Sequence, residues 1–144
     1  MSDAISILFI DGNKCDRDYY AWRLRASPLS YDIVHAATGR AGLNHCARQP
    51  IECVVLEIDL PDMSGFEVLA KLIRSTCHPE MAVVVLTGLP NPYLLELALR
   101  NGAQAALQKM TPSGHMIEKT ILAAIANVKK DRELRRGQTL SEHT

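Results

Sequence analysis

The sequence lacks an excess of charge of either sign. Its 16 Lys and Arg residues balance 16 Asp and Glu residues, which gives a formal net charge of zero at pH 7. Proteins that bind nucleic acids usually carry a basic patch or stripe, so this balance argues against a nucleic-acid footprint over the whole chain. The charged segment 129–136 ends in Arg135 and Arg136, but acidic residues interrupt it, which also argues against a nucleic-acid role there.

The sequence also lacks closely spaced cysteines and long apolar runs. The four cysteines, Cys15, Cys46, Cys53 and Cys77, are scattered without a C-x-x-C spacing, which suits a reduced cytosolic protein and indicates no metal cluster. No apolar run reaches the roughly 20 residues that span a bilayer. The first residues show no basic segment followed by a long apolar run. We therefore expect a cytoplasmic protein with no signal peptide and no membrane contact.

What the sequence does contain is a regular alternation of strand and helix patterns. Short apolar runs bounded by turn residues predict strands, at residues 5–10, 31–35, 52–57, 81–86 and 105–108. Helical spacing and stop signals predict helices after the first four strands, at residues 15–26, 41–47, 64–75 and 92–101. Thr111 and Pro112 are expected to cap and begin a last helix, whose buried stripe is Ile117, Ile121, Ala124 and Val128.

This alternation predicts one doubly wound α/β domain. Strands that alternate with helices through short connections form a parallel sheet covered on both faces, wound right-handed. We expect a flavodoxin-like (βα)5 fold with strand order 2-1-3-4-5, a single domain over residues 1–128. Residues 129–144 are charged and helix-prone, and we expect a helical extension or linker there. Trp22, on the first predicted helix, is expected to serve packing.

Polar residues follow four of the predicted strands where each strand ends. Asp11 follows the first strand, Glu57 ends the third, Thr87 follows the fourth and Lys109 follows the fifth. Open α/β sheets place their functional crevice at the carboxyl ends of the strands. We therefore expect these four side chains to meet in one crevice.

The stretch from Val54 to Gly65 carries a family pattern. It contains an apolar strand, the carboxylate Glu57, Pro61 four residues later and Gly65 after that. This stretch resembles the phosphoacceptor segment of receiver domains, the response-regulator half of two-component signalling, and the resemblance extends over residues 5–128. It implies a cluster of acids that holds Mg²⁺ beside an acceptor Asp, and a hydroxyl and a Lys that grip the phosphoryl oxygens.

The sequence departs from the receiver pattern at four positions. Gly12 stands where the family has a second acid that binds the metal directly, and Glu57 stands where the family has the acceptor Asp. Met110 replaces a Pro, and Ala106 replaces the Tyr or Phe that turns inward on activation. The resemblance therefore implies a degenerate receiver, or pseudo-receiver, in which Thr87 and Ala106 occupy the positions that relay the switch.

These departures bear on metal binding. Asp11, Glu57 and Asp59 would be vestiges of a metal site, and we expect no cofactor and at best weak Mg²⁺ binding, because Mg²⁺ demands well-placed oxygens. Asp59 and Asp62 are expected to be solvated acids, and Asp59 is not favoured as an alternative acceptor. Glu57 and Lys109 could equally form a buried ion pair that holds the crevice together, and losing one acid at Gly12 is expected to bring the pocket closer to neutral.

Three functions compete on the sequence alone. The first is a receiver-like module that signals by protein contacts without phosphorylation, in which Glu57 mimics the phosphorylated Asp or locks one state, and which is not an enzyme. The second is a working receiver that catalyses its own Mg²⁺-dependent phosphorylation at a degraded site. The third, a flavodoxin-like cofactor binder, is opposed by the segment 11–14, which lacks a phosphate-cradling loop rich in Gly and Ser or Thr.

The expected partner is another protein. Residues 94–99 are apolar nearly all round, and an exposed apolar face often marks a binding surface. The resemblance implies an output face over residues 92–128 that contacts a histidine kinase or an output domain. The tail from residue 129 could also support a homodimer.

Overall fold

The fold is known from a computed structural model that describes residues 3–74 and 81–142. Five parallel strands form one sheet in the order β2-β1-β3-β4-β5, which confirms the predicted flavodoxin-like order. The strands are β1 Ile5–Ile10, β2 Tyr31–Ala36, β3 Cys53–Leu56, β4 Ala82–Thr87 and β5 Ala105–Gln108. The helices that alternate with them are α1 Lys14–Arg25, α2 Gly39–Arg48, α3 Gly65–Arg74, α4 Pro92–Arg100 and α5 Ile117–Glu142.

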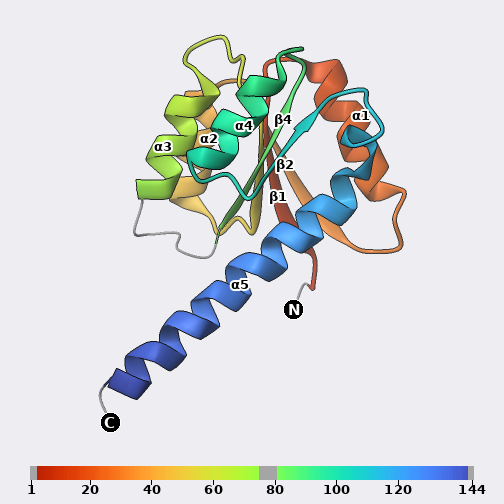
Figure 1. Cartoon of the computed structure of the whole chain (residues 1–144). Helices are drawn as coiled ribbons and strands as arrows, with labels where there is room; N and C mark the ends of the chain where they lie inside the picture. The colour runs from red at the N-terminus through yellow and green to blue at the C-terminus, as the bar shows by residue number, and fades with distance from the viewer. Residues whose placement is uncertain (1–2, 75–80, 143–144) are drawn as a thin grey trace.

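Helices cover both faces of the sheet. Helices α2, α3 and α4 lie on one face, and α1 and the first half of α5 lie on the other (Figure 1). Side chains alternate between these faces along each central strand. Leu8 of β1 packs into the core under α2, α3 and α4, and the next residue, Phe9, packs into the core under α1 and α5.

The central strands are apolar because they are buried on both faces. Every residue of β3 and of β4 is buried, so these segments read as continuous Val and Leu runs. The parallel register pairs Ile10 with Leu56 and Leu56 with Val85. The carboxyl ends of β1, β3 and β4 therefore reach the same edge of the sheet, where the polar residues that follow them meet.

The start of the last helix differs from the prediction. Residues 112–113 form a turn, a 3-10 helix spans Gly114–Met116, and α5 begins only at Ile117. Thr111 does cap this segment, because its hydroxyl oxygen accepts a hydrogen bond from the Gly114 N–H at 3.1 Å. The backbone of Gly114 lies so close to β5 that a Cβ there would meet the Gln108 carbonyl oxygen at 2.4 Å. This close approach separates the cap from the α-helix.

Helix α5 continues well past the buried stripe, whose residues are buried as predicted. It extends as one helix through Glu142 and leads away from the sheet (Figure 1). The helical extension is thus present, continuous with the last helix of the domain. Among the described residues, no helix has both the length and the apolar character needed to cross a membrane.

Two smaller expectations need comment. Trp22 is 63% exposed on α1, so the expectation that it serves packing was wrong. The predicted end of the third helix at Ser75, and Cys77 beyond it, lie outside the described residues.

Candidate functional site

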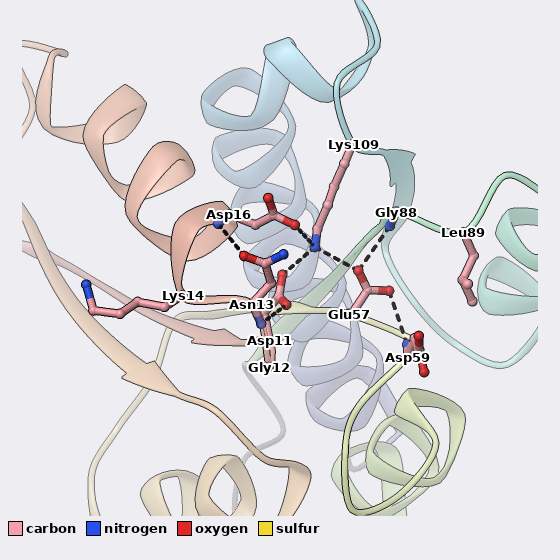
Figure 2. A pocket seen from close by; sticks show the side chains of 10 residues that line it. All are labelled: Asp11, Gly12, Asn13, Lys14, Asp16, Glu57, Asp59, Gly88, Leu89 and Lys109. Carbon is pink, nitrogen blue, oxygen red and sulfur yellow. Dashed lines mark hydrogen bonds and ion pairs between the residues drawn. The ribbon is translucent and has the colours of Figure 1, made fainter.

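A pocket of about 610 Å³ lies at the carboxyl ends of the strands. Figure 2 shows its charged side chains, which come from four different segments. They are Asp11 after β1, Lys14 and Asp16 on the first turn of α1, Glu57 and Asp59 after β3, and Lys109 after β5. The structure thus brings Asp11, Glu57 and Lys109 together as the sequence predicts.

The ammonium group of Lys109 is the centre of this pocket. Its Nζ lies 2.6 Å from Asp11 Oδ2, 2.8 Å from Asp16 Oδ2 and 2.8 Å from Glu57 Oε2. The Lys109 side chain is only 6% exposed. Although burial alone lowers the pKa of an ammonium, the hydrogen bonds to Asp11, Asp16 and Glu57 outweigh it and raise the pKa of Lys109. The group is therefore a fixed cation.

Both carboxylate oxygens of Glu57 are saturated with donors. The extended β3 ends at Leu56, so Glu57 follows the strand directly, and its backbone N–H pairs with the Ile10 carbonyl at 2.9 Å. Five donors reach its side chain: to Oε1, Ile58 N at 2.8 Å, Asp59 N at 3.1 Å and the Thr87 hydroxyl; to Oε2, Gly88 N at 3.0 Å and Lys109 Nζ at 2.8 Å. No other carboxylate in the pocket has so many.

These donors decide the charge state of Glu57. Burial by itself raises the pKa of a carboxyl group, but the hydrogen bonds from Lys109 and Thr87 outweigh it, so the pKa of Glu57 lies below its ordinary value. Asp11 differs, because burial dominates there and the negative charge of Glu57 adds to it, so the pKa of Asp11 is raised in spite of Lys109. Of these two acids, Asp11 takes up a proton more readily.

Thr87 ties the end of β4 to Glu57. Its buried hydroxyl donates to Glu57 Oε1 and its oxygen accepts from the Leu89 N–H at 3.1 Å. One hydroxyl therefore fixes both the carboxylate and the loop that leads into α4. Thr87 therefore does more than close the end of β4, because it also contacts the central acid of the pocket.

Sequence reasoning missed Asp16. Asn13 caps α1 by accepting a hydrogen bond from the Asp16 N–H at 3.1 Å, which places Asp16 on the helix turn nearest the pocket. Its carboxylate gives Lys109 a third acid partner, so the expectation that the pocket is closer to neutral was wrong. The available signal was an acid in the first turn of a helix that starts at the crevice.

Asp62 is exposed, as expected of a solvated acid, but its carboxylate also accepts two backbone hydrogen bonds. Its Oδ1 accepts from the Gly39 N–H at 2.8 Å and its Oδ2 from the Arg40 N–H at 3.0 Å. Hydrogen bonds from Arg40 and Gly39 lower the pKa of Asp62. Asp62 therefore joins the loop after β3 to the start of α2. Asp59 is exposed, as expected.

Comparison with known proteins decides the family. Residues 7–121 match the response regulator receiver domain. The chain belongs to this family. A crystal structure of a CheY-like receiver domain protein from Methanospirillum hungatei JF-1 is 26% identical and covers 90% of this chain and 99% of its own, with a TM-score of 0.76.

Curated relatives include longer proteins that carry a similar segment. A probable cyclic di-GMP phosphodiesterase of Vibrio cholerae is 32% identical over 98 residues, which are 68% of this chain and 22% of that protein. The transcriptional regulatory protein UhpA of Salmonella typhimurium is 28% identical over 113 residues, which are 78% of this chain and 55% of UhpA. The receiver chain thus spans between about a fifth and just over a half of these relatives.

The structure also shows the surroundings of the other three departures from the receiver pattern, at Gly12, Ala106 and Met110. Gly12 is exposed, and a Cβ there would lie 3.1 Å from Pro61 Cδ, so the loops after β1 and β3 approach closely at Gly12. Ala106 is half-buried on β5 against the core under α4. Met110 has a left-handed backbone with φ of 57°, and its N–H donates to the Tyr20 hydroxyl at 3.0 Å.

The acids of this receiver converge on an ammonium. Their oxygens surround Lys109 Nζ at 2.6–2.8 Å, so the ammonium occupies the point where these oxygens would have to meet a metal ion. Within the part of the chain that the structure describes, no cluster of three or more His, Cys, Asp or Glu side chains is arranged to hold a metal ion. As arranged here, these groups fit a Lys ammonium and not the Mg²⁺ that the family implies.

Proposed function

We propose that this receiver signals through protein contacts without being phosphorylated. The observation that carries the proposal is the saturation of Glu57, whose two side-chain oxygens accept from five donors. A carboxylate attacks phosphorus through a free lone pair, and a nucleophile needs the right approach geometry. Glu57 has its lone pairs engaged and its carboxylate displaced by one C–C bond relative to Asp, roughly 1.5 Å. It is therefore a poor acceptor.

Glu57 in this proposal mimics a phosphorylated acceptor. The receiver resemblance assigns Thr87 and Lys109 to gripping phosphoryl oxygens, and in this chain both donate to Glu57 instead. The Gly88 N–H joins them at 3.0 Å. The longer side chain thus brings negative oxygens to donors that a phosphoryl group would otherwise use. This arrangement supports the mimic over a lock on the unphosphorylated state.

The partner that we propose is a histidine kinase or an output domain, bound through residues 92–128. Tyr93 is 56% exposed and Leu99 48% exposed on α4, and both leave apolar surface available for a partner. Receiver domains in two-component systems work through such partners, and the relatives described above are longer than their matching segments. The free thiols of Cys15, Cys46 and Cys53 support a reducing compartment, the cytoplasm.

The alternative is a working phosphoacceptor with Mg²⁺-dependent autophosphorylation. The retained Asp11, Thr87 and Lys109 favour it. Intact mass after incubation with a small phosphodonor and Mg²⁺ distinguishes the two, with a receiver that retains the acceptor Asp treated in parallel. We expect the parallel protein to gain one phosphoryl group and this chain to gain none. A mass gain of one phosphoryl group in this chain, mapped to Glu57 or Asp59, would contradict the proposal.

Mg²⁺ binding gives a second measurement. Because Lys109 stands among the acids, we expect calorimetric titration to show no saturable Mg²⁺ site below several millimolar, an order-of-magnitude bound for poorly arranged oxygen ligands. Saturation at submillimolar Mg²⁺ would favour the working phosphoacceptor.

A further inference from the structure

We propose that Asp16 is a positioning residue that holds the Lys109 ammonium among the acids, where this ammonium acts as the resident cation of the pocket in place of a divalent metal ion. The inference rests on the proposed function because it concerns the same pocket. It adds the residue that keeps the pocket in this state.

The hydrogen-bonding capacity of Lys109 carries the first step. An ammonium group has three N–H donors and no acceptor. Three carboxylates, from Asp11, Asp16 and Glu57, lie within 2.6–2.8 Å of Nζ, and Figure 2 shows them approaching it from different sides. Each N–H therefore has one carboxylate partner. No donor of Lys109 is left for an incoming anion, and Nζ fills the point where the oxygens converge.

Asp16 supplies the partner that completes this set. Without it, Lys109 would serve two acids and keep one N–H directed at the open pocket. Gly12 offers no side chain there, whereas Asp16 reaches Nζ from α1, four residues farther along the chain. Its place is fixed by the Asn13 cap, which accepts from the Asp16 N–H. Asp16 thus supplies from the neighbouring helix turn an acid that Gly12 does not supply from the loop after β1.

Charge supports the same assignment. The three ionised carboxylates around Lys109 are all negative, so they attract its ammonium from every side. Breaking a buried ion pair on one side is costly. Lys109 therefore stays with its acids and does not swing toward another ligand.

The chain offers a matched control for Asp16. Asp18 lies two residues farther on α1, is exposed, and pairs with Lys14 at 2.7 Å. Asp18→Asn removes the same charge from the same helix without touching Lys109. Differences between Asp16→Asn and Asp18→Asn therefore report on the position of the carboxylate and not on net charge.

The first experiment measures the reactivity of Lys109 itself. Purified full-length chains are treated with acetic anhydride in small amounts, and the acetylation rate of Lys109 is read by peptide mass spectrometry. We expect Asp16→Asn to react roughly tenfold faster than the wild type, as the loss of one charge-assisted hydrogen bond implies, and Asp16→Glu to restore much of the protection. Asp18→Asn should react like the wild type. Equal rates for the two Asn variants overturn the inference.

The second experiment tests whether Lys109 replaces a divalent ion. Lys109→Met leaves three acids with no cation, so Ca²⁺, whose oxygen ligands lie at about 2.3–2.6 Å, should raise its thermal midpoint by several degrees. Ca²⁺ should leave the wild type and the exposed-lysine control Lys71→Met unchanged. Adding Asp16→Asn to Lys109→Met should remove most of the gain. A wild-type midpoint that rises as much as that of Lys109→Met overturns the inference.

These outcomes separate the inference from the proposed function. If Lys109→Met does not fold, the acetylation rates still decide the role of Asp16. If the wild type takes up a phosphoryl group while Asp16→Asn exposes Lys109, the proposed function fails and the role of Asp16 stands. If no phosphoryl group is taken up and Asp16→Asn behaves like Asp18→Asn, the proposed function stands and the role of Asp16 fails.

Discussion

At the scale of single residues, the extra methylene of Glu57 explains how one carboxylate serves two sets of donors. Oε1 turns back to accept the N–H groups of Ile58 and Asp59, which belong to its own loop. Oε2 reaches forward to Gly88 and Lys109, which directly follow β4 and β5. An Asp side chain, shorter by roughly 1.5 Å, would not span both sets. Glu57 thus joins three strand ends in one contact.

Glu57→Gln tests this joining role. The Gln side chain keeps one carbonyl acceptor but loses the charge and one acceptor, so we expect the free energy of unfolding at pH 7 to fall by about 1–3 kcal/mol. The loss stays in this range because Lys109 keeps its ion pairs with Asp11 and Asp16 when Glu57 is changed. Urea unfolding measures it, with the exposed Glu67→Gln on α3 as the control. Equal stabilities of wild type and Glu57→Gln would contradict the role.

The stability difference between wild type and Glu57→Gln depends on pH, and the direction of this dependence follows from the pKa of Glu57. The folded pKa of Glu57 lies below its ordinary value of 4.5, so its stabilisation is present above 4.5 and is lost as the pH falls through the lower folded value. Asp11 has a raised pKa and contributes with the opposite sign, but it is present in both proteins. The stability difference between wild type and Glu57→Gln should therefore shrink below pH 4.5. A difference that grows toward acid pH would contradict this assignment.

Residue-level prediction succeeded where the position follows from a strand end. Asp11, Glu57 and Lys109 each come directly after a strand and Thr87 ends one, so parallel topology alone brings them to one edge. Asp16 is different, because an acid in the first turn of a helix is also the ordinary complement of the helix dipole. Only the direction of α1 relative to β5 shows that its carboxylate faces Lys109.

At the scale of elements, α2 depends on a residue from another segment. Its first turn contains no acid of its own, and the carboxylate of Asp62 accepts from two of its first N–H groups. We expect Asp62→Ala to lower the thermal midpoint because these N–H groups lose their partner. The nearby exposed Asp59→Ala should leave it closer to the wild type, and circular dichroism measures both. A larger loss in Asp59→Ala would contradict the capping role.

Helix α5 divides into a packed half and an extended half. Ile117, Ile121, Ala124 and Val128 are buried under the sheet, whereas residues 129–137 are exposed apart from the half-buried Arg132. Since helices are stabilised mainly by packing of an apolar face, we expect truncation after Lys130 to change the free energy of unfolding by less than about 1 kcal/mol. Urea unfolding tests this, and truncation after Ala123 is the destabilising control. A large loss after Lys130 would place the domain boundary beyond residue 128.

Element prediction was most accurate where burial dictates composition. The Val and Leu runs of β3 and β4 are typical of strands that are buried on both faces of a sheet. The start of α5 was misplaced because Thr111 and Pro112 suit the start of a 3-10 helix as well as that of an α-helix. What distinguishes a 3-10 start from an α-helical start here is the close approach of Gly114 to Gln108, which is a tertiary contact.

At the scale of the whole molecule, two features oppose a switch between states. Thr87 is held by Glu57 on one side and by the Leu89 N–H on the other. Ala106 has no ring that could turn inward beneath α4. A ligand shifts a conformational equilibrium only by binding one state better than the other, and the contacts that would distinguish the states are already made within the chain. Under the proposed function, we expect the surface over α4 and α5 to be available to its partner constitutively.

We therefore expect one dominant conformation in solution. Relaxation-dispersion measurements on the wild type should show no millisecond exchange in β4, α4 or β5, and two comparably populated states would contradict the account. The matched variant restores both family acids, Gly12→Asp with Glu57→Asp. It should gain some Mg²⁺ binding, although the new side chain must displace Pro61 slightly, because a Cβ at Gly12 would lie 3.1 Å from Pro61 Cδ. It should still show little change over α4 when Mg²⁺ and a phosphodonor are added, because Ala106 is in place. Phosphorylation of this variant with a clear shift of α4 resonances would show that the relay does not need an aromatic residue at Ala106.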